Sequence, residues 1–389
     1  MTATSNLSEI STIKLNTLTS QLKKIGKGRQ SKWLVNDTYY KADNEGGCEG
    51  LAEVIVSDML KKSNLDRYFT YEPVKITVGK HIYSGCSSPN GLYDGERLVT
   101  TYQLLKKAKT QFFTRIENEF DYGTPKEYLT EFVNEIKRLT NIQHFGEYMK
   151  KTLELDAITL NDDRHFNNIC VIYNTKTRIF EPGPIFDNGH SFSLWHYSSL
   201  TSKNAEEVAE KIEAMPFSHM FNTQRDIAQK LYGGMYLKLE YSRKDLEKTL
   251  EKCEAYYDQD VLDFAKKMCE MQMDRYADYF FTQEREEWKH KIQNEVENNF
   301  SIPVSFHEEG HDFVISPDNM DFSIHTRPSG FVQTNDTDDT LFDISCKYGN
   351  DVFEMYRAIA NTVQEESRRK ETRYTENPER HSGNTTPLL

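Results

Sequence analysis

Leu160-Asn-Asp-Asp163-Arg-His-Phe-Asn-Asn168-Ile-Cys-Val-Ile-Tyr173, followed closely by Pro184-Ile-Phe-Asp187-Asn-Gly189, is the stretch that decides the fold. The apolar run 169–173 ends in Asn-Thr-Lys-Thr, which is typical of a short strand and a turn, and residues 178–186 are typical of a second strand. The residue before the first strand and the residue after the second would then lie at the same end of a hairpin.

Three polar residues in this stretch fit the needs of phosphoryl transfer. That reaction needs one group to orient the attacking hydroxyl and oxygen ligands that hold magnesium against the phosphates. Asp163, Asn168 and Asp187 supply such oxygens. Asp162, Asp163 and Asn167 could instead be plain turn residues, because Asx side chains bond to nearby backbone. The set of Asp163, Asn168 and Asp187 on one predicted hairpin favours a kinase site.

Asp163-Arg164-His165-x-x-Asn168, with Asp187-x-Gly189 after it, resembles the motifs of phosphatidylinositol-kinase-like and HipA-like serine/threonine kinases, in which Arg and His follow the catalytic Asp. The resemblance implies that Asp163 orients or deprotonates the acceptor hydroxyl, with Arg164 and His165 in support. It also implies that Asn168 and Asp187 bind magnesium. The next residue is a departure: Asn188 stands where many kinases carry Phe, which bears on the segment that follows and not on the metal ligand.

A basic loop with two glycines precedes a second predicted hairpin. Glycine lets backbone amides approach phosphates, and neighbouring cations favour the charge, although such a loop is more often a solvated turn. Here it leads into a hairpin that ends at Lys41, the order of a nucleotide-binding lobe. It resembles the phosphate loop of HipA-like kinases, and Lys41 resembles their phosphate-contacting lysine. The loop residues implied to bind nucleotide are Gly26, Gly28, Gln30, Ser31 and Lys32.

By the same resemblance, Ser31 is a candidate autophosphorylation site. A helix partner for Lys41 is also expected, as in kinases. Glu49 and Glu53 lie four residues apart on one face of a predicted helix. We predict that Glu53 pairs with Lys41 because it lies deeper in the helix; the alternative is an exposed carboxylate.

Composition narrows the class of protein. The chain has 389 residues, six scattered cysteines without CxxC spacing, and a net charge of -13. These features argue against a zinc site, a disulfide framework and direct nucleic-acid binding. No apolar run approaches membrane length, and no signal peptide or basic amphipathic membrane-binding segment is visible. We therefore expect a cytoplasmic protein that does not bind membranes.

We predict an α+β, two-lobed protein-kinase-like fold with a small C-terminal α+β appendage. The expected order is a flexible N-terminus, a β-rich N-lobe, a helical C-lobe, the appendage and a disordered tail, at 1–20, 21–110, 111–285, 286–372 and 373–389. His307-Glu-Glu-Gly-His311 within the appendage fits a zinc-protease motif that must lie on a helix. The Gly and the strand-like flanks favour a hairpin turn instead.

Together these features predict transfer of the γ-phosphoryl group of ATP, with magnesium, to a Ser or Thr hydroxyl of a protein, including the kinase itself. A lipid or small-molecule acceptor is an alternative. Another is a nucleotide-binding regulatory module of the toxin–antitoxin type, with little turnover and a cognate regulatory or antitoxin partner. A third makes the appendage the functional end and the kinase lobes its sensor.

Overall fold

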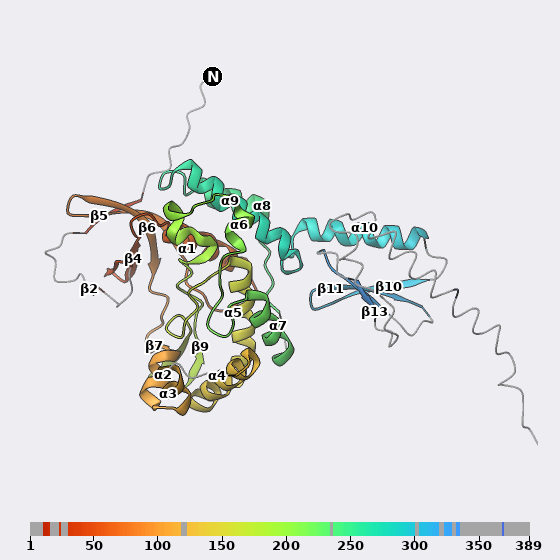
Figure 1. Cartoon of the computed structure of the whole chain (residues 1–389), viewed down its shortest axis with the longest axis horizontal. Helices are drawn as coiled ribbons and strands as arrows, with labels where there is room; N and C mark the ends of the chain where they lie inside the picture. The colour runs from red at the N-terminus through yellow and green to blue at the C-terminus, as the bar shows by residue number, and fades with distance from the viewer. Residues whose placement is uncertain are drawn as a thin grey trace, which may run out of the picture. The chain divides into compact units, whose positions relative to one another are not determined.

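The computed structural model divides into two compact units, Met1–Phe280 and Phe281–Leu389. In the first, a β-rich region is followed by a helical region, so the α+β class expected from the sequence is confirmed (Figure 1). The residues that the structure describes are 11–15, 23–24, 30–117, 123–233, 236–299, 303–318, 323–328, 332–334 and 368.

A six-stranded sheet forms the N-terminal part of the first unit. Its order is β1-β5-β6-β4-β3-β2, with β1 parallel to β5 and the other neighbours antiparallel. Asn36 and Asp37 have φ of 47° and 61°, as a two-residue turn between β3 and β4 requires. The strands are β1 (Thr12–Leu15), β2 (Lys23–Lys24), β3 (Lys32–Val35), β4 (Thr38–Ala42), β5 (Glu72–Val78) and β6 (His81–Pro89).

Helix α1 (Glu49–Lys61) is the central helix of this unit. Of its 13 residues, all but Asp58 and Lys61 are buried, as in a helix that packs on every side. It contacts β5 and β6, helix α8 (Arg243–Glu251) and the 3₁₀ segment η1 (Ser191–Ser199). A Cβ at Gly50 would lie 2.6 Å from the backbone of β6, so only glycine permits this close approach.

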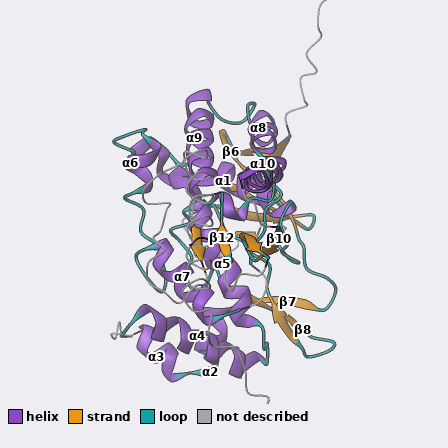
Figure 2. Cartoon of the chain, turned by 90° about the vertical axis from the view of Figure 1, so that its right-hand side faces the viewer, coloured by secondary structure: helices purple, strands orange, loops and turns teal. Residues whose placement is uncertain are grey.

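The helical region holds a small antiparallel sheet of order β7-β8-β9. Its strands are β7 (Glu96–Thr100), β8 (Cys170–Asn174) and β9 (Phe180–Pro182). Helices α2, α3 and α4 lie near this sheet, at the end of the unit away from β5 and β6 (Figures 1 and 2). The helices are α2 (Thr101–Ala108), α3 (Gln111–Glu117), α4 (Pro125–Thr140), α5 (Phe145–Thr159), α6 (Ala205–Ala209), α7 (Phe221–Leu231) and α9 (Gln259–Arg275), followed by η2 (Ala277–Tyr279).

Local sequence explains where these helices begin, and apolar side chains explain how they pack. Helix α4 starts at a capping box in which Thr124 and Glu127 bond to each other's backbone, with Pro125 in the first turn. Helices α4, α5 and α7 close around an apolar cluster that includes Phe132 and Phe145. A separate cluster joins α1 to α5, α8 and α9. The N-terminal sheet and the helical region therefore share a core through α1.

The second unit contains helix α10 (Gln283–Asn299) and a four-stranded antiparallel sheet of order β10-β11-β12-β13. Gly310, with φ of 63°, lies in the turn between β10 and β11, so the segment 307–311 is strand and turn, not helix. Within the described residues, no group of three or more His, Cys, Asp or Glu side chains could hold a metal ion. The strands are β10 (Val304–Glu309), β11 (Asp312–Pro317), β12 (Ile324–Thr326) and β13 (Val332–Thr334).

Some elements differ from the sequence-based expectations. Within the segment 1–20, expected to be flexible, residues Thr12–Leu15 form β1, because pairing with the distant β5 supplies order that the local pattern lacks. The sequence did not indicate α2, α3, β7 or α10. The tail 373–389 lies outside the described residues.

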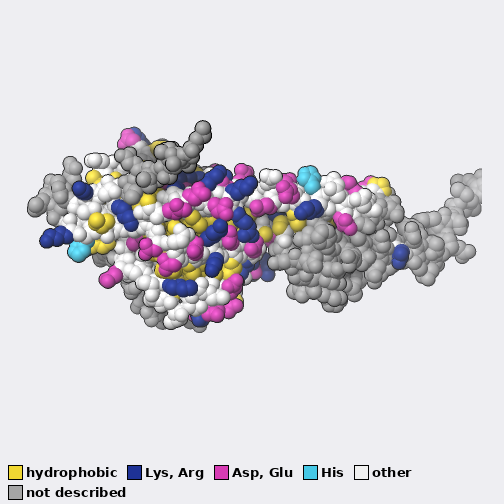
Figure 3. Space-filling model, turned by 90° about the horizontal axis from the view of Figure 1, so that it is seen from above, with side chains coloured by type: hydrophobic (Ala, Val, Ile, Leu, Met, Phe, Trp, Pro, Cys, Tyr) yellow, Lys and Arg dark blue, Asp and Glu magenta, His cyan; other side chains and the backbone are white. Residues whose placement is uncertain are grey.

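None of the described helices is long and apolar enough to cross a membrane. Figure 3 shows Lys and Arg interspersed with Asp and Glu on the face seen from above.

Candidate active site

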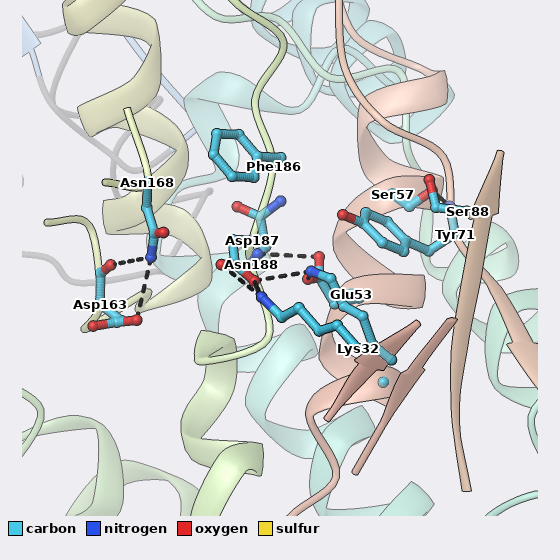
Figure 4. Close-up of polar contacts among 12 residues, drawn as sticks. Lys32, Glu53, Ser57, Tyr71, Ser88, Asp163, Asn168, Phe186, Asp187 and Asn188 are labelled. Carbon is cyan, nitrogen blue, oxygen red and sulfur yellow. Dashed lines mark hydrogen bonds and ion pairs between the residues drawn. The ribbon is translucent and has the colours of Figure 1, made fainter. Parts of the chain in front are cut away.

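Four charged side chains from separate parts of the first unit meet in one cluster. Lys41, on β4, contacts Glu53 of α1 through Nζ and Oε1, and its Nζ lies 2.8 Å from Asp187 Oδ1. Lys32, at the start of β3, places Nζ 3.2 Å from Oδ1 and 3.1 Å from Oδ2 of Asp187. Of the two glutamates considered as partners of Lys41, Glu53 makes the contact, whereas Glu49 accepts a hydrogen bond from the Asn44 backbone. Figure 4 labels three members of this cluster, Lys32, Glu53 and Asp187.

The two lysines keep the Asp187 carboxylate ionised. Burial alone would raise the pKa of Asp187, but the ammonium groups of Lys41 and Lys32 hold that pKa well below its usual range. Burial would lower the pKa of Lys41, yet Asp187 and Glu53 outweigh it and the pKa rises. Lys41 also lies over the Tyr71 ring, 4.9 Å from its centroid. An ionised carboxylate beside a cationic lysine matches what a metal–nucleotide site requires.

Asp163 and Asn168 lie on one side of Asp187, and Lys32 and Glu53 lie on the other (Figure 4). Leu160 caps the C-terminus of helix α5, and its φ of 53° turns the chain into the loop that carries Asp163. The Asn168 amide nitrogen donates to the Asp163 carbonyl at 2.8 Å and to its carboxylate at 3.2 Å. Because the nitrogen is engaged in this way, the amide oxygen of Asn168 is the atom left for a metal.

Arg164 is buried beneath the loop and all five of its N–H donors are used. Its guanidinium binds Asp156 of α5 at 2.8 to 3.1 Å, the Asn168 carbonyl at 3.0 Å and the Phe186 carbonyl at 2.9 Å. The fifth N–H donates to Asn188 Oδ1 at 2.7 Å. With 1% of its side chain exposed, Arg164 holds other residues in place and has no access to a substrate.

The other predicted residues surround this centre. His165 is half-exposed, and its Nε2 lies 3.8 Å from Asp163 Oδ1. Ser31 accepts a hydrogen bond from the backbone of β4 at 3.0 Å through its carbonyl. The side-chain amide nitrogen of Gln30 is buried and has no hydrogen-bond partner in the described part of the chain. The two predicted loop glycines, Gly26 and Gly28, lie outside the described residues.

Sequence reasoning missed several residues that hold the site together. Asp156 and Asn188 bind Arg164, as described above. Asp162, interpreted only as a turn residue, accepts a hydrogen bond from Trp195 Nε1 at 3.1 Å and lies 2.9 Å from His190 Nδ1. Asp162 therefore ties the segment after Asp187 to the loop that carries Asp163. No local pattern marks these residues, because their partners lie 8 to 33 residues away in the sequence.

Comparisons with known proteins add a distant likeness. No protein-family profile matches this chain, and no curated protein sequence matches it. Among solved structures, it is similar to a Helicobacter pylori proinflammatory kinase, CtkA. The identity is 14% and the TM-score 0.42, over 67% of this chain and 94% of that chain.

The arrangement within the first unit decides the class of fold. A β-rich region supplies Lys41, a central helix supplies its glutamate, and a helical region supplies the loop with Asp163 and the hairpin with Asp187. The fold is protein-kinase-like. The two-lobed architecture expected from the sequence is thus confirmed, and any finer assignment depends on the chemistry of the site.

Proposed function

We propose that this protein is an ATP- and magnesium-dependent phosphotransferase, and specifically a serine/threonine protein kinase of the HipA-like type. The observation that supports the proposal is the convergence of Asp187 with the buried Lys41–Glu53 pair, close to a loop that joins Asp163 to Asn168. The charges of Lys41 and Glu53 are buried and each needs a compensating partner. Ionisable groups in such environments cluster at sites that bind a ligand or carry out a reaction.

Each residue has a role that its position supports. Lys41, fixed by Glu53, binds the phosphates. Asp187 and the amide oxygen of Asn168 would hold magnesium, which would supply positive charge to neutralise the charge that develops on the phosphates. Asp163, whose side chain is 35% exposed, orients the acceptor hydroxyl. When nucleotide binds, the Lys32 ammonium group moves from Asp187 to the phosphates, because the Asp187 carboxylate and the phosphates compete for its positive charge.

The acceptor is proposed to be a Ser or Thr hydroxyl of a protein. The resemblance to HipA-like kinases supports this choice, and it also makes Ser31 the candidate for autophosphorylation. Mass-spectrometric mapping of wild type beside Ser31→Ala tests that site: phosphate on the wild-type loop peptide supports it, and phosphate only at other residues contradicts it. A lipid or small-molecule acceptor is distinguished by labelling purified lipids and metabolites.

The test of the reaction is incubation with γ-labelled ATP and magnesium, with label measured on the protein and on a cell extract. We expect Asp163→Ala and Asp187→Ala to abolish the label. Asp94→Ala is the matched control, since its side chain is 91% exposed and remote in sequence from the motifs. Label that survives Asp187→Ala contradicts the proposal, as does failure of the wild type to bind ATP in calorimetry.

A second candidate is the nucleotide-binding regulatory module with little turnover. One observation favours it: both oxygens of Asp187 are engaged by lysines of the protein itself, an arrangement that disfavours metal binding. This candidate predicts ATP binding without label, and binding that persists in Asp163→Ala. Pull-down of a cognate regulatory or antitoxin partner that depends on ATP would then identify its role.

A further inference from the structure

Asn188 follows the proposed metal ligand directly and is held by two elements at once. Its Oδ1 accepts a hydrogen bond from Arg164 Nη2 at 2.7 Å, and its backbone N–H donates to Glu53 Oε2 at 3.0 Å. Only 2% of the residue is exposed. One residue thus joins the arginine under the loop of Asp163 to the glutamate that contacts Lys41. Figure 4 shows Asn188 and Glu53 of this link.

The backbone of Asp187 needs such support. Its φ is 57°, in the left-handed region that residues other than glycine adopt at a cost and only where neighbours hold them. On one side, the Phe186 carbonyl accepts a hydrogen bond from Arg164 Nη1 at 2.9 Å. On the other side, Asn188 is anchored through both its side chain and its backbone. The peptide groups that flank Asp187 are therefore fixed by buried partners on each side.

We propose that Asn188 is a positioning residue that keeps Asp187 in the orientation for metal binding and couples the catalytic loop to the Lys41–Glu53 pair. This inference rests on the proposed function, because it assigns a metal to Asp187. A continuous chain of contacts runs from Asp156 through Arg164, Asn188, Glu53 and Lys41 to Asp187. Asn188 is the link between its two halves.

The chemistry of this position explains an amide in place of an apolar side chain. Arg164 has one donor left after Asp156 and the two carbonyls are bound, and a buried donor without a partner is costly. Leu or Phe at 188 offers no acceptor, so the guanidinium would shift and release the Phe186 carbonyl. Asp at 188 keeps an acceptor oxygen in the same place.

The experiment measures how nucleotide binding and phosphorylation depend on magnesium concentration in the full chain. The test variants are Asn188→Leu and Asn188→Asp. Gln224→Leu is the matched control, because Gln224 is a buried amide (1% exposed) in α7 with a hydrogen bond to the Met215 carbonyl. We expect Asn188→Leu to raise the half-saturating magnesium concentration about 10- to 100-fold, the range found when an outer residue that orients a metal ligand is lost. Binding of ATP in excess EDTA should change little.

Asn188→Asp should stay close to wild type, and so should Gln224→Leu. If Asn188→Leu unfolds, Asn188→Ala, which removes the amide without adding a larger apolar side chain, takes its place. A folded Asn188→Leu or Asn188→Ala with wild-type magnesium dependence overturns the inference, and so does an equal loss in Asn188→Asp. Wild-type protein that binds no nucleotide in magnesium overturns the proposed function itself, which is a different result.

Discussion

The two halves of the site differ in how firmly the protein holds them. The side chains of Lys41 and Glu53 are 8% and 0% exposed, whereas those of Asp163 and His165 are 35% and 43% exposed. The first half is part of the core, because α1 is buried on nearly every side. The second half lies on a loop that is anchored from below by Arg164. The groups proposed to bind phosphate are thus preformed, and the side proposed to receive the acceptor is open.

This difference has a consequence for regulation. Breaking the Lys41–Glu53 contact by moving α1 would unpack the helix from β6, α8 and η1 together. Such a movement exposes a large apolar surface and is therefore unfavourable. Control of activity is expected at the lightly held groups, Lys32 and the loop of Asp163, and not at the central helix.

The largest effect should come from the buried half. Glu53→Gln keeps the shape of the side chain but removes the charge that compensates Lys41, so we expect a loss of about 3 kcal/mol in the free energy of unfolding, together with loss of activity. Chemical denaturation measures it. Glu181→Gln, 62% exposed, is the control and should unfold like wild type. Equal stabilities of the two variants would mean that the buried pair is not a structural element.

The exposed half should show the opposite pattern. Asp163→Asn leaves the shape of a partly exposed side chain unchanged, so its unfolding free energy should stay within about 0.5 kcal/mol of wild type. The rate of phosphorylation should fall about 10²- to 10⁴-fold, because the group that orients the hydroxyl is lost. Parallel denaturation and rate measurements test this. A marked loss of stability would show that both halves are held alike.

Lys32 is intermediate in exposure between the two halves, with 25% of its side chain exposed. Lys32→Ala removes a cation that competes with metal for Asp187, so the half-saturating magnesium concentration should fall about two- to fivefold, the size expected for a partly exposed ion pair. The KM for ATP should rise, because a phosphate ligand is lost. Magnesium titrations at saturating ATP separate the two effects. Lys32→Arg is the control that keeps the charge; a magnesium requirement that rises in Lys32→Ala refutes the competition.

The smallest effect concerns His190. Burial would lower its pKa, but the hydrogen bond to Asp162 and the charges of Asp163 and Glu49 outweigh burial and raise the pKa above 6.5. A raised pKa means that this contact stabilises the fold fully below pH 6.5 and loses that effect as pH rises through the higher value. Because the group is partly exposed, the effect should be about 0.5 kcal/mol. Stability of His190→Gln should vary less over this pH interval than that of wild type; identical profiles would contradict the assignment.

Local sequence was sufficient for much of the fold and for the residue types of the site. The hairpins of β3 with β4 and of β8 with β9 follow from short apolar runs and the turns between them. Asp163 and Asn168 lie in one loop, so their spacing alone indicated their proximity. The same reasoning placed Glu53 on a helix face, and the resemblance to kinases predicted Lys41 as its partner. Patterns of this kind depend on neighbours a few residues away, which the sequence displays directly.

Tertiary structure alone decided what holds these groups. Asn188 and Glu53 are 135 residues apart, and Asp187 and Lys32 are 155 apart, so no periodicity could reveal their contacts. Asp162 seemed a turn residue until the chain brought Trp195 to it. The pairing of β1 with β5 likewise arises only in the folded protein. The sequence by itself determined which chemical groups are available; the close packing around α1 determined which of them meet, because buried charges are stable only beside partners that folding supplies.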